Sequence, residues 1–363
     1  MATPFPCRRS RRHVLACFEC FQSPPAQTVI PSVLGHLREG PPALHPIARS
    51  RDRRIINEFI LRYTGVTMEN KPVVVGIDGS AAALDAVRWA AHEAILHATR
   101  LTIVCCVDDD ILALSDYPWP DRYYEQLKEH AQKDLAEASS VAVSEILAAG
   151  SDIAVDTRML LCDARIGLQR FAATAQVLVV GAYGETRRAS GLLGSVAEAV
   201  STHAGCRVVV VREQLDSVRE SMPNTVVVGV DGSRCSELAV ESAFEEASLR
   251  NASLLAIHAW NFKKIQSVFS TDHRALSWKE TRTAEEAVLS ESLAGQSDRY
   301  PDVEVTQQVH NSDPVGALRD AGDNACLLVV GSHGRGGFTG RLLGSTSRAL
   351  LHTVTCPILV VRA

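Results

Sequence analysis

An internal repeat constrains the fold of this chain more than any other feature of its sequence. Three segments occur twice in the same order: KPVVVGIDGS (71–80) with NTVVVGVDGS (224–233), AQVLVVGAYGETRRASGLLGSVA (175–197) with ACLLVVGSHGRGGFTGRLLGSTS (325–347), and CRVVVVR (206–212) with CPILVVR (356–362). A chain built in this way folds as two copies of one unit. We therefore expect one domain over 71–213, a polar linker over 214–223 and a second domain over 224–363.

Within each copy, short β-branched runs alternate with longer segments of helical periodicity. In the first copy the predicted strands are 73–77, 101–107, 153–161, 177–181 and 207–211, and the predicted helices are about 80–97, 122–148, 164–174 and 191–203. The strands are apolar along most of their length, as in a parallel sheet that helices cover on both faces. The predicted fold class is α/β, with two tandem doubly wound parallel five-stranded sheets of the Rossmann-like type.

Residues 1–70 differ from the rest of the chain. They are rich in arginine and proline, show no sustained hydrophobic period and have no second copy. The apolar stretch after Arg12 is too short for a signal peptide, and Cys17 and Cys20 lack the second ligand pair of a zinc knuckle. We expect a disordered arm, or a start assigned upstream of Met68.

Composition narrows the choice of partners and location. The chain has 363 residues, of which 46% are hydrophobic, and a formal net charge of −5, which does not favour nucleic acid as a partner. No apolar run approaches the roughly 20 residues of a membrane helix. Several of the 10 cysteines lie in or beside apolar strands, as reduced core thiols do. The expected location is the cytoplasm, without membrane association.

Ligands of a doubly wound sheet bind beyond the carboxyl ends of the strands, where the winding reverses. Two segments of each copy fall there: the exit of the first strand, with Asp78 or Asp231, and the glycine-rich stretch after the fourth strand. Glycines permit close backbone approach and positive φ, and the helix that follows offers its N-terminus to an anion. Two simpler interpretations stay open. The glycines could serve turn geometry alone, and the aspartates could cap the following helices.

The glycine-rich stretch follows the same spacing in both copies, G-x2-G-x9-G-S. Its members are Gly181, Gly184, Gly194 and Ser195 in the first copy and Gly331, Gly334, Gly344 and Ser345 in the second. This spacing resembles the ATP-binding signature of the universal stress protein family. The exits VGIDGS and VGVDGS, the HAW at 258–260 and the terminal CPILVVR are also similar to that family. Over 71–363 the chain resembles the tandem universal stress proteins of mycobacteria and other actinobacteria.

The resemblance implies a fold of the adenine nucleotide alpha hydrolase-like type that binds ATP, alone or with Mg²⁺. The segments of Asp78 and Asp231 would hold the adenine and ribose side, and the glycines and serines of the spacing would hold the phosphates. Tyr183, His333 and Arg335 would be rim contacts or solvated loop residues.

No enzyme class matches the motifs equally well. A P-loop NTPase needs GK[ST], a dinucleotide-binding dehydrogenase needs GxGxxG after the first strand, and neither occurs where it should. A response regulator needs further acids and a lysine that this chain lacks. An ATP pyrophosphatase has SGGxDS where this chain has GxDGS.

The expected function is therefore that of an ATP-binding stress-response sensor or regulator, which acts through nucleotide-dependent conformation or partner binding. Two alternatives stay open: a slow ATPase or ATP-dependent transferase that uses the same loops, and an interaction scaffold without nucleotide.

Further expectations concern assembly and the difference between the copies. The apolar strands 207–211 and 357–361 are predicted to pair antiparallel within the chain, and two chains to form a homodimer of four domains with an unknown regulatory protein as partner. The second site is expected to bind more tightly, because its loop has more glycines and lacks the charge of Glu185. No role is assigned to four histidines of predicted helices: His92, His97, His203 and His352.

Overall fold

The computed structural model describes residues 71–108, 121–184, 193–212, 224–260, 278–334 and 343–363. The predictions for the arm 1–70 and the linker 214–223 lie outside the described residues, as do those for Arg335 and Glu185. Within the described ranges, no helix combines the length with the apolar character that a membrane span needs.

The first half of the chain alternates strands and helices in the predicted order. Its elements are β1 (Val73–Ile77), α2 (Ala81–Leu96), β2 (Leu101–Val107), α4 (Asp121–Ala148), β3 (Val155–Leu161), α5 (Ala164–Ala172), β4 (Val177–Gly181), α6 (Ser195–His203) and β5 (Arg207–Val211). Strands β1, β2, β4 and β5 have the predicted bounds. Helix α6 begins four residues later than predicted, at Ser195, because Gly194 is its N-cap.

The second half repeats this order with a short extra helix. Its elements are β6 (Thr225–Val230), α8 (Arg234–Arg250), β7 (Ser253–Trp260), α10 (Trp278–Leu293), α11 (Gln296–Arg299), β8 (Val305–Asn311), α12 (Pro314–Gly322), β9 (Leu327–Gly331), α13 (Ser345–Thr353) and β10 (Ile358–Val361). We call residues at the same position of the two halves counterparts.

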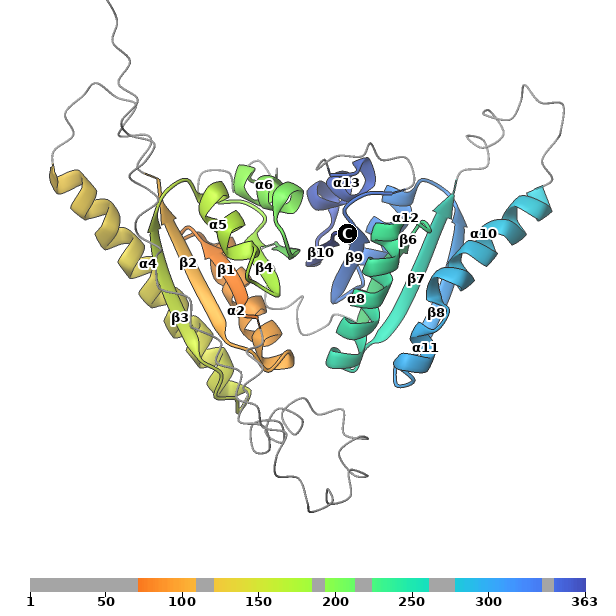
Figure 1. The fold of residues 1–363 in the computed structure, drawn as a ribbon, viewed down its shortest axis with the longest axis horizontal. Coiled ribbons are helices and arrows are strands. Elements are labelled where there is room, and N and C mark those ends of the chain that lie inside the picture. Colours follow the sequence, from red (N-terminus) through yellow and green to blue (C-terminus); the bar gives the residue numbers. More distant parts are fainter. Residues whose placement is uncertain (1–70, 109–120, 185–192, 213–223, 261–277, 335–342) are drawn as a thin grey trace, which may run out of the picture. The chain divides into compact units, whose positions relative to one another are not determined.

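Each half forms a parallel sheet in which the winding reverses between the first and fourth strands. The strand order is β3-β2-β1-β4-β5-β10-β9-β6-β7-β8, so both halves contribute to one 10-stranded sheet (Figure 1). The predicted fold class is confirmed. The two five-stranded sheets are joined at β5 and β10, which pair antiparallel.

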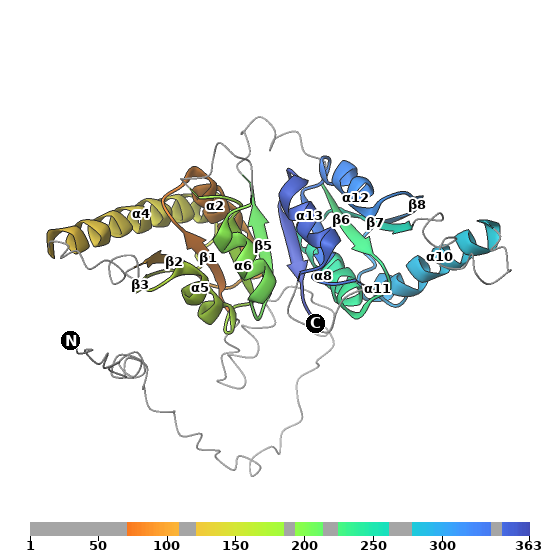
Figure 2. The ribbon, with the colours of Figure 1, turned by 90° about the horizontal axis from the view of Figure 1, so that it is seen from above.

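Helices cover both faces of the sheet, as the apolar strands require. One face packs against α2, α4, α8 and α10, and the other packs against α5, α6, α12 and α13 (Figures 1 and 2). Alternate residues of each strand enter the two cores, so that Val209 lies in one and Val208 in the other. The cysteines among the described residues form no disulfide, as expected, and burial raises the pKa of Cys356 to about 12.

The junction between the halves is apolar and buried. In β5 and β10, Val209 pairs with Leu359, and Val210 pairs with Ile358. Val209 and Leu359 are 0% and 1% exposed. The predicted antiparallel pairing within one chain is confirmed, and it covers the β5 edge of the first half and the β10 edge of the second.

Replacing Val209 by lysine should destabilise the junction strongly, because it would bury an ammonium group without a partner. The cost of burying such a charge is several kcal/mol. Urea unfolding should show a lower midpoint, and small-angle scattering should show the halves moving apart. Leu147→Lys is the control, because Leu147 is 68% exposed on α4. Equal unfolding midpoints for the two variants would contradict the expected role of the junction.

Candidate functional site

The two segments predicted at the strand ends are in contact in each half. Asp78 follows β1, and Gly184 follows β4, the next strand of the sheet. A Cβ atom on Gly184 would overlap the carboxylate of Asp78, and one on Gly334 would overlap that of Asp231. Any larger residue at this point of the spacing would displace the acidic side chain, so glycine lets the aspartate keep its position.

The two aspartates hold the serines that cap the next helix. Asp78 Oδ1 accepts hydrogen bonds from the backbone N–H and the hydroxyl of Ser80, at 3.1 and 2.6 Å. Ser80 Oγ in turn accepts from the N–H of Ala83 and is the N-cap of α2. Ser233 likewise caps α8, and its N–H donates to Asp231, but its hydroxyl donates to the His333 carbonyl at 3.3 Å. The interpretation that the aspartates themselves cap the helices is wrong.

This turn also contains a glycine that the backbone requires. Gly79 and Gly232, which directly follow the aspartates, have φ of +80° and +72°. Side chains other than glycine rarely adopt this left-handed conformation. The sequence D-G-S therefore encodes an acidic side chain, a left-handed turn and a helix cap in three consecutive residues.

The glycines of the spacing serve close approach and not positive φ, which none of them adopts. A Cβ atom on Gly181 would lie 3.0 Å from the backbone carbon of Ala82, and one on Gly331 would lie 2.9 Å from that of Cys235. The N–H of Gly194 donates to the Ala182 carbonyl at 2.7 Å, which closes the base of the loop. The expectation of positive φ at these positions is thus corrected.

Helices α6 and α13 begin beside these glycines without a side-chain cap. Their N-caps, Gly194 and Gly344, offer no side-chain hydrogen bond, and the exposed Ser195 and Ser345 start the helices. The first-turn N–H groups therefore have no side-chain acceptor at the N-cap. Such a helix end favours a bound anion.

A cavity lies over these elements in each half. It measures about 200 Å³ in the first half and about 520 Å³ in the second. One wall is apolar, formed by Val104, Leu168 and Val180 in the first half and by Ile257, Leu318 and Val330 in the second. Each glycine and serine of the G-x2-G-x9-G-S spacing lines one of the cavities, together with Asp78 or Asp231.

The linings of the two cavities differ in polarity. Three apolar residues of the first cavity have hydroxyl-bearing counterparts in the second: Ala83 and Ser236, Val196 and Thr346, Ala197 and Ser347. Of these hydroxyls, Ser347 Oγ donates to the Gly331 carbonyl at 2.6 Å. The sequence contained this difference, but our prediction of unequal sites relied on loops outside the described residues.

His333 and Tyr183 are counterparts and both line a cavity, as expected of rim residues. His333 Nδ1 lies 3.0 Å from the hydroxyl of Ser332, whereas its buried Nε2 has no hydrogen-bond partner among the described residues. Burial, and then the charge of Arg362, lower the pKa of His333. Both effects favour the neutral ring.

The second cavity is also lined by three residues that the sequence analysis did not name as site residues: His258, Trp260 and Glu285. Buried His258 donates from Nδ1 to the Val230 carbonyl at 2.7 Å, and its Nε2 lies 2.6 Å from Glu285. The histidine thus ties the exit of β6 to α10. Pairing with a distant helix could not be read from the HAW segment alone.

Comparisons with known proteins place the chain in a family. A model described as the universal stress protein family matches residues 69–212 and again 222–362. A universal stress protein of Mycobacterium tuberculosis is 36% identical over 290 residues, which cover 80% of this chain and 96% of that protein.

A solved structure of a family member shares the fold. A universal stress protein from Archaeoglobus fulgidus has a TM-score of 0.55 at 19% identity, and covers 80% of this chain and 96% of its own. Another universal stress protein, solved in complex with cAMP, is 25% identical and covers 39% of this chain and 96% of its own, with a TM-score of 0.29. The two family matches and the tandem relative together show that the chain belongs to the universal stress protein family.

Proposed function

We propose that each half binds an adenine nucleotide, with ATP as the ligand, and that the bound nucleotide biases conformation or partner choice in the response to stress. The observation that carries the proposal is one constellation found twice. In each cavity an aspartate, a glycine in contact with it and an uncapped helix N-terminus lie together.

The constellation suits the three chemical parts of a nucleotide. The apolar wall, with Leu168 or Leu318, provides a surface for the base. The carboxylate of Asp78 or Asp231 can accept hydrogen bonds from ribose hydroxyls, because an ionised carboxylate has about four acceptor positions.

The phosphates would lie at the start of α6 or α13. Backbone N–H groups there, with the hydroxyl of Ser195 or Ser345, provide donors for phosphate oxygens. The glycines let those oxygens approach the backbone closely. Mg²⁺ would then arrive with the phosphates.

The second site should bind the nucleotide more tightly. Its cavity of about 520 Å³ falls in the usual range for ligand sites, whereas about 200 Å³ does not. Thr346 adds a hydroxyl where the first half has Val196, and His333 adds a ring nitrogen where it has Tyr183. A tenfold difference in Kd corresponds to about 1.4 kcal/mol.

Calorimetric titration with ATP tests both statements. Gly334→Ala should abolish the tighter site, because the new Cβ would displace the Asp231 carboxylate, and Gly184→Ala should abolish the weaker one. Gly316→Ala is the matched control, since a Cβ there meets nothing within 4 Å.

Two results would count against the proposal. Absence of binding by the unmodified chain would reject nucleotide binding altogether. Loss of the tighter site in Gly184→Ala would reverse the order of the sites. Phosphate release during the same titration separates a regulator from a slow ATPase.

Assembly and location stay predictions. Because β5 and β10 pair with each other, a homodimer of four domains would form through surfaces other than these edges. Light scattering of the purified chain measures its mass, and affinity purification from stressed cells would identify a regulatory partner. The cytoplasmic location is a prediction from the composition and the cysteine usage of the sequence.

A further inference from the structure

The surface that joins the two halves has approximate two-fold symmetry. Val209 pairs with Leu359, its own counterpart, at the middle of the antiparallel β5–β10 contact. In a two-fold contact between identical units, if residue i of one unit touches residue j of the other, then residue j of the first also touches residue i of the second. Each contact across this surface can therefore be compared with the contact that two identical halves would make.

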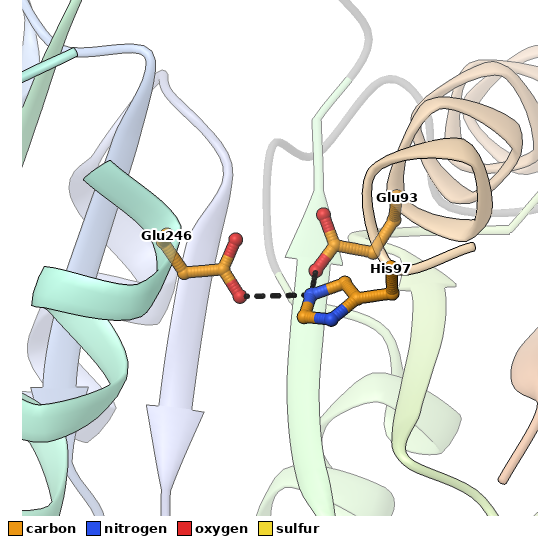
Figure 3. A group of neighbouring side chains, drawn as sticks. All are labelled: Glu93, His97 and Glu246. Carbon is orange, nitrogen blue, oxygen red and sulfur yellow. Dashed lines mark ion pairs between the residues drawn. The ribbon is translucent and has the colours of Figure 1, made fainter. Parts of the chain in front are cut away.

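A buried ionic cluster crosses the surface between α2 and α8 (Figure 3). Glu93 lies on α2 and His97 is the C-cap of that helix, and their counterparts Glu246 and Arg250 lie on α8. His97 Nε2 lies between the two carboxylates, 3.2 Å from Glu93 Oε1 and 3.6 Å from Glu246 Oε1. Arg250 binds the other oxygen of both, with its Nη2 2.5 Å from Glu93 Oε2. Glu93, His97 and Glu246 are at most 2% exposed.

The cluster has the residue types of a metal site, but its charges are balanced without a metal ion. Arg250 engages both acids, and the buried ring of His97 lies between the same two carboxylates, where its protonation would balance the second charge. His97 occupies the position that arginine occupies in the other half and bridges the same two acids. We therefore interpret the cluster as a cross-half ion network in which His97 is a cation.

Further contacts around the cluster also join unlike residues. Arg207 of β5 lies 2.9 Å from Glu245, and their counterparts, Pro357 and His92, could not form that pair. The guanidinium of Arg250 lies 5.5 Å from the ring centroid of Trp89, whose counterpart is Ser242.

On the opposite face of the sheet, α6 and α13 meet through counterparts of opposite charge. Glu198 Oε1 accepts from Arg348 Nη2 at 2.6 Å. Two identical halves would place glutamate against glutamate or arginine against arginine here.

Two other arginines contribute equally to both sides. Arg212 donates to the Leu351 carbonyl at 2.7 Å, and its counterpart Arg362 donates to the Ser201 carbonyl at 2.8 Å. Because these two bonds are equivalent, they would form equally well between like and unlike halves, so they stabilise the contact without selecting the partner.

We propose that this pairing surface is selective for unlike halves, so that its partner is the opposite half of a chain and never a second copy of the same half. In a pair of first halves, Trp89 would lose its contact with the Arg250 guanidinium, and the Glu198 side chains of the two copies would face each other. In a pair of second halves, the Arg348 side chains of the two copies would face each other, and Glu245 would face Pro357 in place of Arg207. The two repeats have thus diverged at the positions where they meet.

Covalent linkage alone also favours unlike pairing, so the test must remove it. A protease site is placed within residues 213–223, and the folded full chain is cut there. Both fragments are then unfolded together in urea and refolded, so that each fragment selects its partner again. Native mass spectrometry counts pairs of unlike and like fragments.

The expected result is a population of unlike pairs, unchanged by a metal chelator. A statistical mixture of pairs, refolding to unpaired fragments or loss of pairing in the chelator would each overturn the proposal.

Charge reversals on the exposed Glu198–Arg348 contact provide variants that fold. Glu198→Arg or Arg348→Glu alone should lower the ratio of unlike to like pairs about two- to fivefold, as for a surface ion pair. The double reversal should restore the ratio. A double variant no more selective than the single ones would contradict the role of this contact.

Discussion

Replacing Arg250 by methionine is expected to lower the free energy of unfolding by about 3–5 kcal/mol, the usual cost of removing one partner from a buried ion pair. Arg250 binds Glu93 and Glu246, which are both 2% exposed. Without the guanidinium, two carboxylates would share one imidazolium within the protein. Burial alone raises the pKa of Glu93, but Arg250 and His97 outweigh it and lower that pKa to about 2.

Urea unfolding at neutral pH measures this effect. Arg348→Met is the matched control, because it also removes a cross-half arginine, but from a contact that is 61% exposed on the arginine side. Its cost should stay below about 1 kcal/mol. Equal costs for the two variants would show that burial of the ion network contributes nothing to the junction.

Raising the pH from 6.5 to above 9 is expected to remove about 3 kcal/mol of stability that His97 contributes. Burial by itself lowers the pKa of His97, but the neighbouring carboxylates of Glu246 and Glu93 outweigh it and raise the pKa from 6.5 to about 9. The folded state therefore holds a proton that the unfolded state releases near pH 6.5. The contribution is complete below pH 6.5 and is lost as the pH rises through 9.

The groups that face His97 decide the size of this effect. Glu93 lies on its own helix, and Glu246 and Arg250 face it from α8. Arg207 of β5 lies 3.9 Å from Glu246. The side-chain amide of Gln176 lies 2.5 Å from His97 Nδ1 through its nitrogen, and an imidazolium requires the amide to be turned so that its oxygen accepts from Nδ1–H.

His97→Arg is the control, because arginine keeps its charge over the whole range. The difference in unfolding free energy between the unmodified chain and this variant should change by about 3 kcal/mol between pH 6.5 and 9.5. If both proteins lose the same stability, other groups cause the loss and His97 is not the cation of the cluster.

The sequence by itself determined the fold class, the tandem arrangement and most element bounds. Strands such as Val73–Ile77 are apolar and β-branched on both faces, a local pattern that a covered parallel sheet requires. Because the sequence is repeated, each of these patterns occurs twice in the chain. The sequence also located Asp78 and Gly184 at strand ends, because loop positions follow from strand order.

Only the tertiary structure decided why these residues occur together. The glycines are required by atoms far away in the chain, such as the Asp78 carboxylate beside Gly184, whereas local φ preferences suggested a different reason. The volumes of the cavities likewise depend on how several strand ends and helices converge.

The ionic cluster shows the same limit most clearly. His97 lies in a helical stretch, where a polar residue is usually solvated, and we assigned it no role. One signal was present, because Glu93 and Glu246 recur at the same position of the repeat. Its meaning required the pairing of β5 with β10, since only that contact brings α2 and α8 together and excludes water from their charges.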